Sequence, residues 1–209
     1  MSLNLPRIYP VTDRRLSGLS HAEQVKRLIA GGAKLIQLRD KQATPREFYH
    51  QAAGALKVAR DLGGRLIVND RVDIALALKA DGVHLGQTDM PVQAARDLLG
   101  QTAIIGISTH NLAQAQLATR WPVDYIAFGP IFATASKENP DPTVGLSRLA
   151  EVRSIVGALP LVAIGGIDFA NACETLSFGA DALAIISALV AEPTQIQENM
   201  RRMLLATNS

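Results

Sequence analysis

The chain alternates short apolar runs with longer amphipathic segments, and it completes this alternation eight times. The apolar runs begin near residues 7, 34, 65, 82, 103, 125, 161 and 182. Each run is apolar at consecutive positions, a pattern typical of strands in a parallel sheet that is buried on both faces. Eight strand–helix units without a second domain predict an α/β fold of the closed (β/α)8, or TIM-barrel, type. An open doubly wound sheet is the alternative architecture.

Two of the amphipathic segments open with helix-start signals. Ser20 stands at the N-cap position of a helix predicted over 21–30. Thr44 and Pro45 stand at the N-cap and first helical positions of a helix predicted over 45–62. The same periodicity predicts helices at 72–79, 91–99, 112–119, 147–156, 170–177 and 194–205. The segment 131–146 follows neither pattern over 16 residues, a length typical of lids and binding loops.

Composition excludes several classes of protein. A length of 209 residues fits one domain spanning 1–209. The net charge of +2 and the aromatic content of 4% argue against a nucleic-acid interface. Cys173 is the sole cysteine, so an internal disulfide is excluded and a reducing compartment is expected. Neither a signal-peptide pattern nor an apolar run of roughly 18 residues is present, so we expect a cytoplasmic protein without a membrane partner. The sequence leaves a homo-oligomer open.

Polar side chains recur where the predicted strands end. In a parallel barrel all these ends lie on one face, where enzymes of this fold place their active sites. The recurrence, rather than any single ending, predicts a site. The polar residues at or just after strand ends include Gln37, Arg39, Asp40, Lys41, Asn69, Asp70, Asp89, Ser108, Thr134, Ser136, Lys137 and Ser187.

Asp70 and Asp89 follow neighbouring strands and form a candidate metal site. Mg2+ prefers oxygen ligands, and one or two carboxylates together with phosphate oxygens complete its octahedron. The alternative is structural: Asp70 would cap the helix that begins near Val72, and Asp89 would simply precede Pro91. The residues alone leave both interpretations open.

Cations and glycines on the same face indicate that anions bind there. Arg39, Lys41 and Lys137 suit a polyphosphate, although the two lysines can also be solvated loop charges. Gly165–Gly166 follows the seventh strand, where backbone N–H groups can hold a phosphate; the alternative is a tight turn that requires glycine. The face provides for two anions but offers no obvious nucleophile. This combination indicates a diphosphate that leaves and a phosphate that anchors a second substrate.

The sequence resembles the thiamine-phosphate synthase family. The matching motifs, in family order, are QLRDK (37–41), NDRVDIALALKADGVHLGQTDMP (69–91), GISTHN (106–111), FGPIFATASK (128–137), VGL (144–146), VAIGGI (162–167) and GADALAIISAL (179–189). They extend over nearly the whole chain. One small departure lies in the loop, where Ser136 stands in place of the threonine that the family often carries.

The resemblance implies a Mg2+-dependent transferase. Such an enzyme joins hydroxymethylpyrimidine diphosphate to hydroxyethylthiazole phosphate and gives thiamine phosphate and pyrophosphate by way of a pyrimidine carbocation. Asp70 and Asp89 would bind the metal, and the catalytic residues would be Arg39, Lys41, Ser108 and Lys137. The implied substrate-binding residues are Gln37, Leu38, Arg39, Asp40, Lys41, Asn69, Ser108, Thr134, Ala135, Ser136, Lys137, Gly166, Ile186 and Ser187.

Two rival functions share the barrel. A thiazole tautomerase-like relative would lack the metal aspartates and carry a histidine after the strand-six glycine, but here Pro130 follows Gly129. A non-catalytic protein that binds thiamine precursors would need no means of expelling diphosphate. Another phosphate-anchoring barrel isomerase would need a general base, and neither His84 nor His110 is assigned that role.

Overall fold

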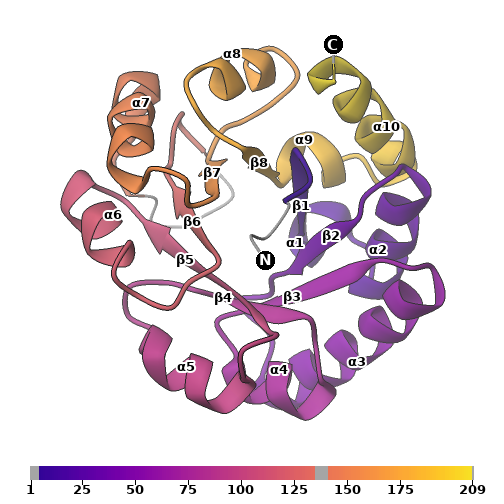
Figure 1. Cartoon of the computed structure of the whole chain (residues 1–209). Helices are drawn as coiled ribbons and strands as arrows, with labels where there is room; N and C mark the ends of the chain where they lie inside the picture. The colour runs from indigo at the N-terminus through magenta and orange to yellow at the C-terminus, as the bar shows by residue number, and fades with distance from the viewer. Residues whose placement is uncertain (1–4, 135–140, 209) are drawn as a thin grey trace.

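The computed structural model describes residues 5–134 and 141–208, and within these ranges eight parallel strands close into a barrel (Figure 1). Each strand pairs with its neighbours in chain order, and β8 pairs with β1. The predicted TIM barrel is therefore confirmed, and the open sheet is wrong. The strands are β1 (Ile8–Thr12), β2 (Leu35–Leu38), β3 (Arg65–Asn69), β4 (Gly82–Leu85), β5 (Ile104–Thr109), β6 (Tyr125–Phe128), β7 (Leu161–Ile164) and β8 (Ala182–Ile185).

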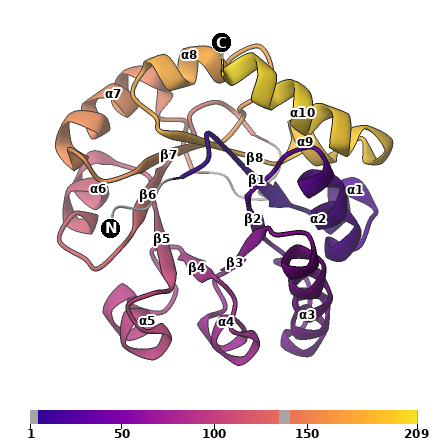
Figure 2. The same cartoon turned by 45° about the vertical axis from the view of Figure 1, so that its right-hand side comes forward.

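Helices surround the barrel on its outer side (Figure 2). They are α1 (Arg14–Ser17), α2 (His21–Ala30), α3 (Pro45–Asp61), α4 (Val72–Leu78), α5 (Val92–Leu99), α6 (Leu112–Ala118), α7 (Gly145–Val156), α8 (Ala172–Ser177), α9 (Ser187–Val190), the 3-10 helix η1 (Pro193–Gln195) and α10 (Ile196–Thr207). The short helices α1 and α9 were not predicted, because four residues show no periodicity. Within the described residues, no helix is long and apolar enough to cross a membrane.

Helix-capping side chains formed as the sequence predicts. Ser20 accepts a hydrogen bond from the backbone of Glu23 at the start of α2. Thr44 and Glu47 make a reciprocal capping box at the start of α3, with Pro45 in its first turn. These bonds satisfy N–H groups that the first turn of a helix leaves without a partner.

Each strand sends alternate side chains into two separate apolar layers. Ile36, Leu38 and Leu66 point outward and pack against the helices. Tyr9, Leu35 and other inward residues fill the barrel interior. Both layers are buried, which explains why the strands are apolar at consecutive positions.

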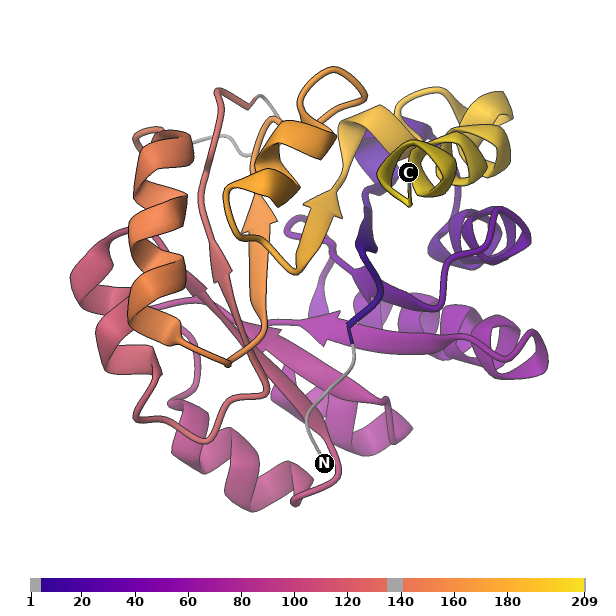
Figure 3. The same cartoon turned by 45° about the horizontal axis from the view of Figure 1, so that its top comes forward.

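Aspartates fasten the N-terminal end of the barrel. Asp81, Asp124 and Asp181 directly precede β4, β6 and β8, and each accepts the backbone N–H of a residue in the preceding strand at 2.7–2.8 Å. Arg96 of α5 pairs with Asp124, and Arg153 of α7 pairs with Asp181, each at 2.7 Å. These contacts link neighbouring strands and helices at the N-terminal end of the barrel, opposite the C-terminal strand ends. Figure 3 shows the helices beside the strands.

Candidate active site

A cavity of about 490 Å³ opens at the C-terminal ends of the strands. It collects most of the residues that the sequence places in a site. Those that line it are Gln37, Arg39, Lys41, Asn69, Asp70, Asp89, Ser108, Thr134, Gly166, Ile186 and Ser187. Ala135, Ser136 and Lys137 lie outside the described residues.

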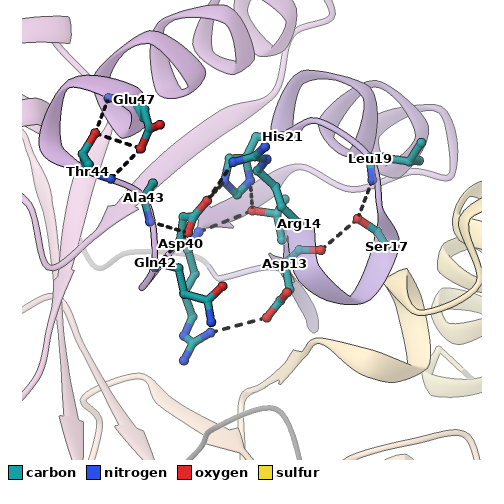
Figure 4. A network of polar contacts seen from close by, with 12 residues as sticks. Asp13, Arg14, Ser17, Leu19, His21, Asp40, Gln42, Ala43, Thr44 and Glu47 are labelled. Atoms are coloured by element: carbon teal, nitrogen blue, oxygen red, sulfur yellow. Dashed lines mark hydrogen bonds and ion pairs between the residues drawn. The ribbon is translucent and has the colours of Figure 1, made fainter.

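Leu38 and Asp40 do not line the cavity. Leu38 is buried in the outer layer between the barrel and its helices. Asp40 turns toward α1 and α2, where its carboxylate lies 3.3 Å from Arg14 and 3.7 Å from the ring of His21 (Figure 4). Its second oxygen accepts the backbone N–H groups of Gln42 and Ala43, each at 3.0 Å. Asp40 therefore holds the loop that carries Lys41.

Asp70 and Asp89 lie side by side at the cavity wall. Asp70 has a left-handed backbone with a φ of 62°, which turns its carboxylate away from α4 and toward Lys41. Burial raises the pKa of the Asp70 carboxyl; Lys41 opposes this increase, and the adjacent Asp89 adds to it. In the described chain, α4 begins at Val72 with Arg71 at the N-cap position and no side-chain cap, so the capping interpretation of Asp70 is wrong.

Asp89 is oriented by its own loop. Its Oδ2 accepts the backbone N–H of Gly86 at 2.7 Å. Two adjacent carboxylates that interact unfavourably create a position for a hard cation with oxygen ligands. Among the described residues, no group of three or more His, Cys, Asp or Glu side chains could by itself hold a metal ion. A metal held here therefore needs further oxygen ligands from a bound molecule or from water.

The two described cations of the site have different settings. Arg39 is 17% exposed and lies 3.5 Å from Asp13, the N-cap residue of α1. Lys41 is 53% exposed and pairs with Asp70. Both line the cavity, so an anion bound there would meet a largely buried guanidinium and a more exposed ammonium group.

The glycines after β7 permit a close approach of two loops. Gly165 and Gly166 both have positive φ, and a Cβ at Gly166 would lie 2.5 Å from the carbonyl oxygen of Ala133. The backbone of Phe132 donates to Gly165 at 3.0 Å. The turn thus requires glycine for packing, and Gly166 also faces the cavity. The two interpretations of this pair are compatible.

A buried polar chain forms the floor of the cavity, and the sequence did not reveal it. Gln37 Nε2 lies 3.2 Å from the Tyr9 hydroxyl, which lies 3.0 Å from the Tyr125 hydroxyl. Nδ1 of His84 lies 2.8 Å from Tyr125, and Nε2 lies 2.7 Å from Ser108 Oγ. Burial lowers the pKa of His84 to about 4, so the ring is neutral at pH 7. Polar residues at inward positions of apolar strands were the signal that could have identified the chain.

Known proteins resemble this chain over almost its full length. A family model described as thiamine monophosphate synthase matches residues 8–189. The thiamine-phosphate synthase of Chloroflexus aurantiacus is 45% identical, over 96% of this chain and 94% of its own. That of Methanospirillum hungatei is 44% identical, over 89% and 90% of the two chains.

Solved structures of known proteins also resemble this chain in fold. A thiamine phosphate pyrophosphorylase from Pyrococcus furiosus superposes with a TM-score of 0.84 at 36% identity and covers 97% of both chains. Tryptophan synthase from Mycobacterium tuberculosis, with a TM-score of 0.71 at 12% identity and coverage of 99% and 94%, shares the fold alone. The family model and the identity to curated relatives lead to one conclusion: the chain belongs to the thiamine monophosphate synthase family.

Proposed function

We propose that the protein is a thiamine-phosphate synthase that transfers the pyrimidine of hydroxymethylpyrimidine diphosphate to the nitrogen of hydroxyethylthiazole phosphate. Membership of the family identifies it as an enzyme, a transferase. The observation that supports this reaction is the position of Asp70 beside Asp89 and Lys41 on the wall of a cavity large enough for two small substrates. The products are thiamine phosphate and pyrophosphate.

Mg2+ fits the donor set of the site. Asp70 and Asp89 would each supply a carboxylate oxygen, and diphosphate oxygens would supply others, as Mg2+ usually requires. When bound, the metal supplies positive charge against the departing diphosphate. Burial raises the pKa of the Asp70 carboxyl and the adjacent Asp89 adds to this increase, so a cation between the two carboxylates would be favourable.

The remaining cavity residues divide between the two substrates. Arg39, Lys41, Asn69 and Lys137 would hold the diphosphate, and Gln37 and Ser108 would lie against the pyrimidine. The thiazole phosphate would be bound by Thr134, Ser136, Gly166, Ile186 and Ser187. Among the described residues, those assigned to the diphosphate lie at or just after the ends of β2 and β3, and those assigned to the thiazole phosphate follow β6, β7 and β8.

The proposed chemistry is dissociative. The bond between the pyrimidine methylene carbon and the diphosphate oxygen breaks, and the electron pair leaves with the diphosphate. The thiazole nitrogen then attacks the resulting carbocation. No protein nucleophile is needed, so catalysis rests on positioning and on stabilisation of the leaving charge by Arg39, Lys41 and Lys137.

Two other functions are less well supported. A tautomerase-like relative would carry a histidine directly after Gly129, where this chain has Pro130. A non-catalytic binder of thiamine precursors would not need two carboxylates held together at the cost of their repulsion.

One assay tests the proposal. Purified protein is mixed with both substrates, with Mg2+ or with a chelator, and thiamine phosphate and pyrophosphate are measured. We expect equal amounts of thiamine phosphate and pyrophosphate in the samples with Mg2+, and neither product in the samples with the chelator. Folded protein that binds the thiazole phosphate but forms no product would return the site to a binder or a tautomerase.

A further inference from the structure

The chain of hydrogen bonds beneath the cavity has a direction. A tyrosine hydroxyl carries one hydrogen, and a neutral histidine carries one N–H donor and one acceptor nitrogen. Gln37 donates from Nε2 to Tyr9, so the hydrogen of Tyr9 is directed to Tyr125. Tyr125 then donates to His84 Nδ1. The proton of the ring must therefore lie on Nε2, which donates to Ser108 Oγ.

The opposite direction is unfavourable. If His84 carried its proton on Nδ1, it would donate to Tyr125, and Tyr125 would donate to Tyr9. Tyr9 would then accept from both Tyr125 and Gln37, and its own hydrogen would lack an acceptor among the contacts of the described residues. Tyr9 is 1% exposed, so water does not compensate, and such a buried donor costs free energy.

We propose that Tyr9, Tyr125 and His84 are positioning residues that fix the polarity of two cavity groups. Because His84 donates to Ser108, the Ser108 hydroxyl is a hydrogen-bond donor toward the cavity. Because Gln37 uses one N–H on Tyr9, it presents its carbonyl oxygen and its second N–H to a bound molecule.

This polarity fits an aminopyrimidine. The edge of such a ring carries an exocyclic amine beside an acceptor nitrogen, the pattern that a glutamine amide reads with one acceptor and one donor. The inference rests on the proposed function for the identity of the ligand. It goes further by assigning the selectivity of Gln37 and Ser108 to three residues beneath them.

The packing around Tyr125 supports a fixed arrangement. Its ring stacks on His84, with centroids 5.5 Å apart, and meets the ring of Tyr9 edge to face at 5.8 Å. A Cβ at Gly106 would lie 2.0 Å from the Tyr125 ring, so glycine is needed to admit it. The hydroxyl groups are therefore held in place by apolar packing as well as by hydrogen bonds.

The first test measures the tautomer of His84. Ring 15N shifts of the intact protein distinguish a proton on Nε2 from one on Nδ1, and the spectrum of His84→Gln identifies the signals among those of the other histidines. The proton is expected on Nε2 in the wild type. A proton on Nδ1 would overturn the proposal, and this result does not depend on what the enzyme makes.

The second test measures binding of hydroxymethylpyrimidine diphosphate by calorimetry in the presence of Mg2+. Tyr125→Phe should weaken binding about 10-fold, the loss of one buried hydrogen bond. Ser108→Ala should weaken it similarly, and the loss in the double variant should be smaller than the product of the two single losses, because part of the effect of Tyr125 acts through Ser108. Ser108→Thr should retain binding. Tyr49→Phe, on the exposed face of α3, is the matched control.

Two binding results would overturn the proposal: multiplicative losses in the double variant, or wild-type binding by Tyr125→Phe. If the wild type itself neither binds nor converts the pyrimidine diphosphate, the proposed function fails, while the ring-nitrogen shifts still decide the direction of the chain. The two failures are thereby distinguished.

Discussion

At the residue scale, Asp70 combines features that oppose stability. Its φ is positive, and burial together with Asp89 raises the pKa of its carboxyl. A raised folded-state pKa means that the stability associated with this group is present below its unfolded pKa and is lost as pH rises through the folded value. Metal-free protein at pH 7 therefore carries an unfavourable charge.

We expect Asp70→Asn to be inactive and yet more stable than the wild type without Mg2+. Its thermal midpoint should rise by about 2–4 °C, the shift that corresponds to about 1 kcal/mol in a chain of this size. Mg2+ should stabilise the wild type but not the variant. Asp97→Asn, on the exposed face of α5, is the control and should leave the midpoint unchanged. A lower midpoint for Asp70→Asn would contradict the account.

His21 makes the protein sensitive to acid. It is fully buried, its Nδ1 lies 2.8 Å from Thr12 Oγ1, and burial lowers its pKa to about 4. Between an unfolded pKa of about 6.5 and this value, the unfolded chain binds the proton and the folded chain does not. The free energy of unfolding should therefore fall as the pH decreases through this window.

His21→Gln should lose less stability on acidification than the wild type. From pH 6.5 to 4.5 the difference should be roughly 2–3 kcal/mol, measured by urea unfolding at each pH. His50→Gln, at an exposed position of α3, should follow the wild-type curve. Parallel curves for His21→Gln and the wild type would show that His21 is not the group responsible.

At the scale of elements, the aspartates at the N-terminal end of the barrel differ in the partners that lose a contact when the carboxylate is removed. Asp124 accepts the N–H of Ile105 and also neutralises Arg96, whose side chain is 5% exposed. Asp81 accepts the N–H of Leu66, and its own contacts include no described salt bridge. Removing a partner from a buried charge costs more than losing one neutral hydrogen bond.

Asp124→Asn should therefore destabilise the protein by about 2–3 kcal/mol, and Asp81→Asn by about 1 kcal/mol. Both variants should keep their activity, because these residues lie at the end of the barrel away from the cavity. Denaturant unfolding and steady-state assays check the two parts. If Asp124→Asn and Asp81→Asn lost equal stability, leaving the Arg96 charge without its partner would carry no additional free-energy cost.

At the scale of the whole molecule, barrel closure brings the two ends of the described chain together. Arg7, before β1, donates to the backbone carbonyl of Thr207 at the end of α10. A circular permutant, in which a linker joins the original termini and the new termini lie at Gly63–Gly64 between α3 and β3, should fold. It should also remain active, because this loop lies away from the cavity. Reopening at Gln87–Thr88, in the cavity wall, should cost about 100-fold in activity. Circular dichroism and product assays compare them, and loss of folding in the first permutant would contradict the prediction.

The sequence predicted the barrel because its signal is repeated. Consecutive apolar positions in each strand and caps such as Thr44 gave the order of the elements. The strand-end rule also located cavity residues such as Arg39 and Asp89, since parallel strands bring their ends to one face. It could not tell that Leu38 points outward or that Asp40 turns toward α1, because these directions depend on the register of each strand end. The polar floor escaped for a similar reason: Tyr125 resembles an ordinary core residue until its neighbours across the barrel are known.

Two backbone hydrogen bonds, here called the neck, join the ends of the segment between β6 and α7. Val144 donates to the carbonyl of Pro130 at 2.9 Å, and Gly145 donates to that of Ile131 at 3.2 Å. These bonds join the two ends of the segment independently of what lies between them. Residues can therefore be inserted or deleted beyond the neck without shifting β6 or α7. In evolutionary terms, the part of the chain that carries Lys137 can vary in length while the barrel that supports it is inherited intact.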